Sequence, residues 1–229
     1  MKIGGLQRVS LIDYPGLISA VVFLQGCNFK CSYCHNPELV DPRLFQPCLR
    51  ENDIFDFLDT RKGKLDAVSI TGGEPTLQDK LPAFIKHIRK MGFAVKMDTN
   101  GSQPKVIRNL LAEKLLDFIA MDIKAPLEKY KDIVKATVNP DSIKESINLI
   151  LKAKIPYEFR TTIVESQLGE NDILQIGKLI AGADHYVLQN FVSTKTLDKK
   201  FLKEKPFSDE KLQKIKSHLE KQITSVTIR

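Results

Sequence analysis

Three of the chain's four cysteines lie close together in the segment QGCNFKCSYCHNP, residues 25–37. Cys27, Cys31 and Cys34 follow the spacing C-x₃-C-x₂-C, and Cys48 lies further along the chain. Thiols stay reduced in the cytosol, so clustered cysteines there more often bind metal or do chemistry than form disulfides. The cluster therefore predicts a centre with sulfur ligands.

Two kinds of centre suit three thiolates. Structural zinc usually takes four protein ligands, and His35, a conceivable fourth, directly follows Cys34, which makes it awkward to turn onto the same ion. A 4Fe–4S cluster is normally held by four thiolates, and with three of them one iron keeps an open position for a substrate. Cys48 could close that position. A single cysteine is more commonly a small buried thiol, however, and we expect Cys48 to be structural.

Length, composition and charge narrow the class of protein. With 229 residues, 42% of them hydrophobic, the chain can bury a substantial core, and we expect a single domain over residues 1–229. No apolar run approaches the ~20 residues of a membrane span, and residues 1–16 lack the apolar core of a signal peptide. We therefore expect a cytoplasmic protein that does not bind membranes.

The formal net charge of +7 suits anionic ligands or an acidic partner. The basic run STKTLDKKFLKEKP, residues 193–206, contains one aromatic residue and has no stacking platform for single strands. We expect this run to be a solvated loop, and we expect no nucleic-acid partner.

Strand and helix patterns alternate along the chain. Runs of β-branched and aromatic residues predict strands at residues 18–24, 66–70, 93–97, 117–121, 157–163, 185–191 and 223–228. Amphipathic stretches predict helices at residues 81–91, 104–116, 142–154 and 208–222, the last with Ser208 as its N-cap. The alternation is typical of repeated βαβ units and a mostly parallel sheet. A closed eight-unit barrel takes ~250 residues, so the predicted fold class is α/β, a partial (βα)₆ barrel.

Polar segments follow the predicted strands. The cysteine cluster follows the first strand, TGGEP (71–75) the second, DTNG (98–101) the third and DIK (122–124) the fourth, while Gln189 closes the sixth. Parallel α/β proteins build their sites at the carboxyl ends of the strands. We therefore expect these segments to share one rim.

These motifs resemble the radical S-adenosylmethionine superfamily, through the cysteine spacing, Tyr33 before the last cysteine, and TGGEP after the next strand. Within it, SLIDYPG (10–16), CHNP (34–37), DTNG and MDIK (121–124) resemble the enzymes that activate glycyl-radical enzymes, above all the activating proteins of anaerobic ribonucleoside-triphosphate reductase. The resemblance covers residues 5 to about 191. It implies a 4Fe–4S cluster, S-adenosylmethionine, a glycyl-radical enzyme as partner and an electron donor of flavodoxin or ferredoxin type.

The resemblance also implies roles for single residues. Cys27, Cys31 and Cys34 would hold the cluster, and the amino and carboxylate groups of S-adenosylmethionine would chelate the open iron. The residues implied to contact that ligand are Tyr33 and His35 at the adenine, Gly72, Gly73 and Glu74 at the methionine amino group, Asp122 and Lys124 at the methionine end, and Gln189, where related activating enzymes have histidine. Glu74 is expected to hold its turn rather than do chemistry. Asp98 and Thr99, with Asp122, would bind a monovalent cation or the ribose.

Three functions remain in view. The activating enzyme, which takes a hydrogen atom from a glycine of its partner, comes first. A small-molecule radical enzyme such as a 7-carboxy-7-deazaguanine synthase shares the cluster motif and the small size but lacks the DYPG lead-in. A non-catalytic iron–sulfur or zinc module that senses redox state is disfavoured by TGGEP and DIK, because a sensor needs no cradle for an amino acid.

Overall fold

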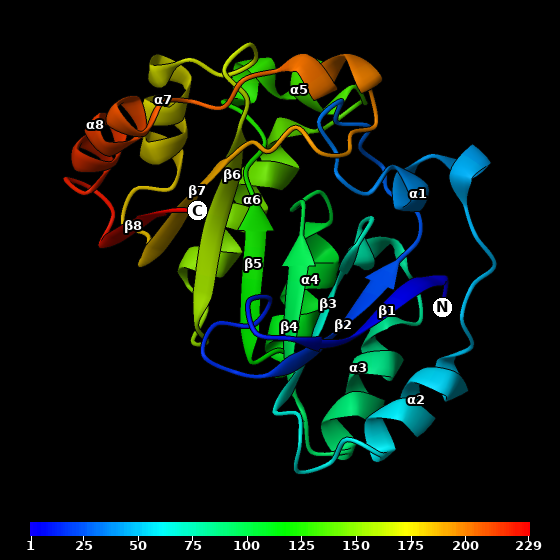
Figure 1. Ribbon diagram of the computed structural model, residues 1–229. Coiled ribbons are helices and arrows are strands. Elements are labelled where there is room, and N and C mark those ends of the chain that lie inside the picture. Colours follow the sequence, from blue (N-terminus) through cyan, green and yellow to red (C-terminus); the bar gives the residue numbers. More distant parts are fainter. The chain divides into compact units, whose positions relative to one another are not determined.

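The computed structural model describes residues 1–229 (Figure 1), and the chain divides into two compact units. Unit 1 comprises residues 1–28, 38–99 and 105–119, and unit 2 comprises residues 29–37, 100–104 and 120–229. Because the chain passes between the units repeatedly, neither unit is one contiguous segment, and the single domain expected from the sequence stays a prediction. The cysteine loop is divided, with Cys27 in unit 1 and with Cys31 and Cys34 in unit 2.

Unit 1 is built on strands that neighbour one another in chain order. They are β1 (Ile3–Ser10), β2 (Ser19–Leu24), β3 (Ala67–Gly72), β4 (Ala94–Thr99) and the start of β5 (Phe118–Asp122). β1 runs antiparallel to β2, whereas β2, β3 and β4 are parallel. Five of the six residues of β2 are buried, as expected for a parallel sheet that is covered on both faces.

Most helices of unit 1 connect these strands along the chain. They are the short α1 (Pro37–Val40), α2 (Glu51–Asp59), α3 (Leu81–Lys90) and α4 (Pro104–Ala112), with 3₁₀ turns η1 (Pro42–Leu44) and η2 (Pro75–Leu77). The buried residues of α3, Leu81, Phe84, Ile85 and Ile88, recur at helical spacing and form one apolar face. Phe55 of α2 packs against Phe84 and His87 of α3, with ring centroids 5.2 and 3.9 Å apart, and Figure 1 shows the two helices side by side.

Unit 2 continues the same pattern from the end of β5. Its further strands are β6 (Tyr157–Ile163), β7 (His185–Asn190) and β8 (Ser225–Ile228), all parallel and in chain order. Its helices are α5 (Tyr130–Val134), α6 (Pro140–Leu151), α7 (Glu170–Leu179) and α8 (Asp209–Leu219), with 3₁₀ turns η3 (Leu127–Lys129) and η4 (Lys199–Lys203). Ser208 caps α8 as predicted, since its hydroxyl accepts from the Lys211 N–H at 3.4 Å.

The predicted α/β class is confirmed, and all seven predicted strands are present within a few residues of their expected bounds. The sequence did not predict β1, which contains two glycines and is held by antiparallel pairing with β2. It also did not single out α7, which carries Gly177 in its interior. A Cβ at Gly177 would lie 2.2 Å from Leu219 Cδ2 of α8, so glycine allows these neighbouring helices to approach closely (Figure 1). No helix combines the length and the apolar character that crossing a membrane requires.

Candidate functional site

The Gly-Gly turn after β3 packs against the backbone that leads to Cys27. The Gly73 N–H donates to the Leu24 carbonyl at 2.7 Å. A Cβ added at Gly72, where φ is +115°, would lie 2.4 Å from Leu24 N, and one added at Gly73 would lie 2.1 Å from the Gly26 carbonyl oxygen. Backbone cannot rotate away from such contacts as a side chain can. The fold of unit 1 therefore requires glycine at both positions, before any ligand is considered.

Glu74 holds this turn, as expected from the sequence. Its carboxylate is buried, and Oε1 accepts from the Thr76 N–H at 3.1 Å, the Thr76 hydroxyl at 2.5 Å and the Thr99 hydroxyl at 2.7 Å. The Glu74 N–H donates to the Gly26 carbonyl at 2.8 Å. One buried carboxylate thus ties the turn after β3 to the end of β4, and the main chain beside it fixes the residue before Cys27.

Gly73→Ala is expected to lower the free energy of unfolding by about 2–3 kcal/mol, the upper part of the usual range for forcing extra volume into packed structure. The physical reason is the overlap of the new Cβ with the Gly26 carbonyl. Urea denaturation followed by circular dichroism measures the change. Gly5→Ala is the matched control, because its nearest neighbour, Phe23, lies at an ordinary 3.8 Å. Equal stability of the two variants would show that the turn yields to the added methyl group.

Asp98 lies beside a buried ammonium. The side chain of Lys96, on β4, is 2% exposed, and its Nζ forms an ion pair with the Asp98 carboxylate. Lys96 therefore already supplies positive charge at this carboxylate. Asp98 and Thr99 belong to unit 1 and Asp122 belongs to unit 2, and the monovalent cation or ribose contact stays a prediction.

In unit 2, Asp122 lies between two cations at the end of β5. Its Oδ1 accepts from Arg160 Nε at 2.8 Å and its Oδ2 accepts from Lys124 Nζ at 3.0 Å. Burial by itself would raise the pKa of Asp122, but the charges of Arg160 and Lys124 outweigh it and hold that pKa well below its usual range. Residues two apart in extended chain project to the same side, and the contact between Asp122 and Lys124 agrees with that spacing.

A chain of charges extends from this cluster. Arg160 Nη1 lies 3.8 Å from Glu158 Oε1, and Arg229 Nη2 lies 3.3 Å from Glu158 Oε2. Asp122 and Glu158 thus alternate with the three cations Lys124, Arg160 and Arg229. Lys124 stands at one end of this series, beside Tyr33 of the cysteine loop, and an ammonium group there can donate to an anionic group.

Lys124 connects β5 to the cysteine loop. Its Nζ lies 6.0 Å from the centre of the Tyr33 ring, within the range of a cation–π contact, and its backbone N–H donates to the Tyr130 hydroxyl at 3.2 Å. The Tyr33 hydroxyl is buried without a hydrogen-bond partner. Burial raises the pKa of the Cys31 thiol to about 11, although the Lys124 charge opposes this.

His35 packs against the segment that follows β7. Its ring stacks on Phe191, with centroids 5.5 Å apart and an interplanar angle of 11°, and its Nε2 lies 2.9 Å from the Val192 carbonyl oxygen. Gln189 pairs in register with Thr162 of β6. The adenine contacts of Tyr33 and His35 and the ligand contact of Gln189 stay predictions.

The expectation of a buried Cys48 is wrong. The residue is exposed and its thiol donates to Gln25 Oε1 at 3.4 Å. Cys48 lies in the irregular segment between η1 and α2, next to Leu49, which forms an isolated bridge with Ile3. The sequence around a single cysteine in a loop does not show whether the thiol is exposed. The prediction therefore relied on the general preference of thiols for the interior, which does not hold here.

Two residues beside the predicted site were not assigned to it from the sequence. Arg160 could have been predicted to form an ion pair, because a charged residue inside an otherwise buried strand needs a partner. Tyr130 begins the short helix α5, and nothing in the sequence around it marked it as a contact of Lys124.

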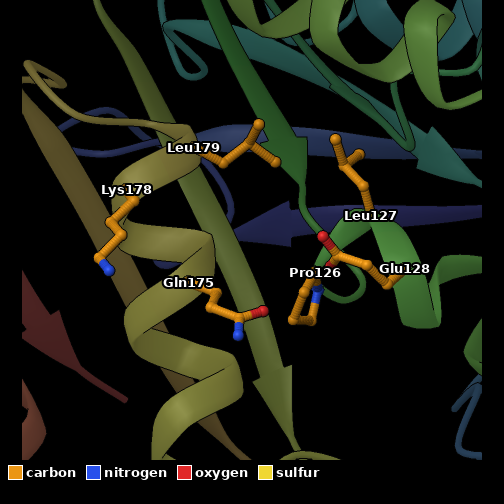
Figure 2. Close-up of a pocket in the computed structure, with 6 residues that line it drawn as sticks. All are labelled: Pro126, Leu127, Glu128, Gln175, Lys178 and Leu179. Carbon is orange, nitrogen blue, oxygen red and sulfur yellow. The ribbon is translucent and has the colours of Figure 1, made fainter.

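A cavity of about 320 Å³ lies elsewhere in unit 2, where the segment after β5 meets α7 (Figure 2). Its lining residues are Pro126, Leu127, Glu128, Gln175, Lys178 and Leu179. Lys129 and Asp172 form an ion pair of 2.8 Å between the same two elements. None of the residues predicted to bind a ligand lines this cavity.

The donor set of the cysteine loop fits an iron–sulfur cluster. None of the four cysteines forms a disulfide, and cysteine sulfurs are the ligands that iron–sulfur clusters take. Within either unit no group of three His, Cys, Asp or Glu side chains is arranged to hold a metal ion. Since Cys27 belongs to one unit and Cys31 and Cys34 to the other, the three-thiolate site stays a prediction.

Comparison with known proteins identifies the family. The sequence profile of the radical SAM superfamily matches residues 21–174. A protein of Methanocaldococcus jannaschii, provisionally named as a glycyl-radical enzyme activating enzyme, is 38% identical over 99% of this chain and 95% of its own length. The pyruvate formate-lyase-activating enzyme of Clostridium pasteurianum is 35% identical over 54% of this chain and 52% of its own.

A solved structure supports the fold alone. SuiB of Streptococcus suis, bound to its precursor peptide SuiA, superposes with a TM-score of 0.70 at 15% identity, over 91% of this chain and 48% of that chain. This chain therefore spans about half the length of SuiB. The profile match and the full-length relative together decide the family: the chain belongs to the radical S-adenosylmethionine superfamily and is an enzyme of that type.

Proposed function

We propose that this protein activates a glycyl-radical enzyme by taking a hydrogen atom from a glycine of its partner. The relative from Methanocaldococcus jannaschii carries the proposal, because it is named for this activity and aligns over nearly the whole of both chains. We further propose anaerobic ribonucleoside-triphosphate reductase as the partner. The motifs SLIDYPG (10–16), CHNP (34–37) and MDIK (121–124) support that choice through their resemblance to its activating proteins.

The family implies a 4Fe–4S cluster and S-adenosylmethionine as cofactors. We assign the cluster to Cys27, Cys31 and Cys34. When both are bound, they supply a one-electron cleavage that yields methionine and a 5′-deoxyadenosyl radical. The Gly-Gly turn supports the assignment, because it fixes the Gly26 carbonyl and with it the backbone that leads to Cys27.

Lys124 is the residue we assign to the methionine carboxylate. Its ammonium suits an anion, and Asp122, which Arg160 also contacts, holds the lysine in place. Asp122 already accepts from two cations, so its main role toward the ligand is to orient Lys124. Tyr33, buried beneath the ammonium, keeps water from one side of it.

The test is radical formation on the partner. Anaerobic incubation with S-adenosylmethionine, dithionite and the anaerobic reductase should produce a stable radical on the reductase, seen by electron paramagnetic resonance as a doublet. Cα-deuterated glycine in the partner should collapse the doublet to a singlet. 5′-Deoxyadenosine should then accumulate in proportion to the signal and contain the deuterium.

A reductase whose radical glycine is replaced by alanine is the control, and it should show neither the radical nor the deuterium transfer. The proposal fails if 5′-deoxyadenosine forms equally fast without any protein partner and in step with the conversion of a pterin or another small molecule. Membership of the superfamily would survive that result, whereas the assignment of a glycyl-radical partner would not.

A further inference from the structure

The segment that follows β7 lies against the cysteine loop of unit 2. The Asp198 N–H donates to the Ser32 carbonyl at 2.9 Å, between Cys31 and Cys34 in the sequence, and His35 contacts Phe191 and Val192. Figure 1 shows this segment in orange, running from β7 past α5 to η4. The backbone of the cysteine loop is thus covered on this side by one stretch of chain.

This stretch, residues 192–205, is basic; we call it the basic segment. Residues 195–205 contain five lysines and two acidic residues. The exposed lysines that enter no ion pair are Lys199, Lys200, Lys203 and Lys205. Val192 and Leu202 add exposed apolar surface, at 57% and 42% exposure. Exposed ammonium groups around a few apolar side chains suit a transient protein partner that is acidic.

Local hydrogen bonds hold the basic segment in one conformation. The Asp198 side chain accepts from the Lys200 N–H at 3.0 Å and caps η4, while the Thr196 hydroxyl donates to the Asp198 carbonyl at 2.8 Å. The lysines of η4 are therefore presented from an ordered turn, rather than from the solvated loop that the sequence suggested.

Different residues of the cysteine loop contact Lys124 and the basic segment. Tyr33 meets Lys124, where we assign the ligand, whereas Ser32 and His35 meet the basic segment. A protein bound to the basic segment would approach Cys31 and Cys34 without occupying the Lys124 site. An electron donor needs this arrangement, because it must come near the thiolates while the ligand stays bound.

We propose that the basic segment is the docking surface for an acidic one-electron carrier protein of the flavodoxin or ferredoxin class. The proposal rests on the proposed function, since that reaction consumes one electron. In the docked pair the carrier is oxidised by one electron and the 4Fe–4S centre is reduced by one, and no atom is transferred. Opposite charge steers such encounters and raises their rate by roughly 10- to 1,000-fold at low salt.

The test compares two double charge reversals in the loaded protein. Lys199→Glu with Lys200→Glu alters the basic segment, and Lys152→Glu with Lys154→Glu is the matched control on exposed residues that precede β6. Stopped-flow absorbance follows reduction of the protein by photoreduced flavodoxin, and calorimetry gives the affinity for oxidised flavodoxin. We expect the first variant to lose on the order of tenfold in second-order rate and in affinity at low salt. The gap should narrow in high salt, where charges are screened.

Reduction by methyl viologen, which needs no protein docking, should be equal in both variants and the wild type. Equal rates and affinities of the two variants with flavodoxin would overturn the proposal. It would also fail if Lys199→Glu with Lys200→Glu instead slowed glycyl-radical formation under chemical reduction, because the surface would then serve the glycyl-radical partner. A wild type that accepts electrons from flavodoxin and yet activates no partner would contradict the proposed function and leave the docking surface standing.

Discussion

Replacing Cys27, Cys31 or Cys34 by alanine is expected to abolish the 4Fe–4S cluster of anaerobically reconstituted protein. Three thiolates are already one fewer than such a cluster normally has, so the loss of another leaves too few ligands to retain it. Iron and sulfide quantitation on purified variants measures the result. We expect one cluster per chain in the wild type and almost none in each variant.

Cys48→Ala is the matched control, and it should keep the full iron and sulfide content. The Cys48 thiol donates to Gln25 and lies on the surface, which also makes the substitution mild for folding. Loss of the cluster in Cys48→Ala would make this residue a ligand and remove the open iron position. Full clusters in any of the other three variants would remove that cysteine from the ligand set.

The parallel strands could be predicted because burial on both faces makes them continuous apolar runs. β2 and β3 show this, with five of six and four of six residues buried, respectively. β1 could not be predicted in the same way, because IGGLQRVS alternates weakly and its pairing depends on β2, a separate strand of the chain. Strands defined by their own composition were found, whereas a strand defined by its neighbour was missed.

The same distinction applies to the candidate site. Asp122 and Lys124 are two residues apart, so strand geometry alone places them on one side. Arg160 meets Asp122 only because β5 and β6 are neighbours in a particular register, which no local pattern encodes. Gly72 and Gly73 were expected at the methionine amino group, which stays a prediction, whereas the close approach of the Leu24 and Gly26 backbone to them could not be predicted from the sequence.

Asp122→Ala is expected to lower the free energy of unfolding at pH 7 by about 3–5 kcal/mol, the usual cost of removing one partner from a buried ion pair. The side chains of Lys124 and Arg160 are only 15% and 12% exposed, and both rely on Asp122 for a short charged contact. Adding Lys124→Met to Asp122→Ala removes one of the two stranded cations, and it should recover part of the lost stability. Urea denaturation of the single and double variants measures both effects.

The pH dependence of the free energy of unfolding distinguishes the contribution of the Asp122 charge from that of its packing. Arg160 and Lys124 hold the folded-state pKa of Asp122 well below the unfolded value of about 4. A depressed pKa stabilises the fold above that unfolded value, and the stabilisation is lost as the pH falls toward the folded-state pKa. The stability gap between the wild type and Asp122→Ala should therefore stay constant from about pH 7 to pH 5 and shrink below about pH 4. Asp59→Ala, which breaks an exposed pair with Lys62, should change stability little at any of these pH values. A stability gap between the wild type and Asp122→Ala that persists unchanged in acid would contradict the prediction. It would mean that Asp122 stabilises the fold through packing and not through its charge.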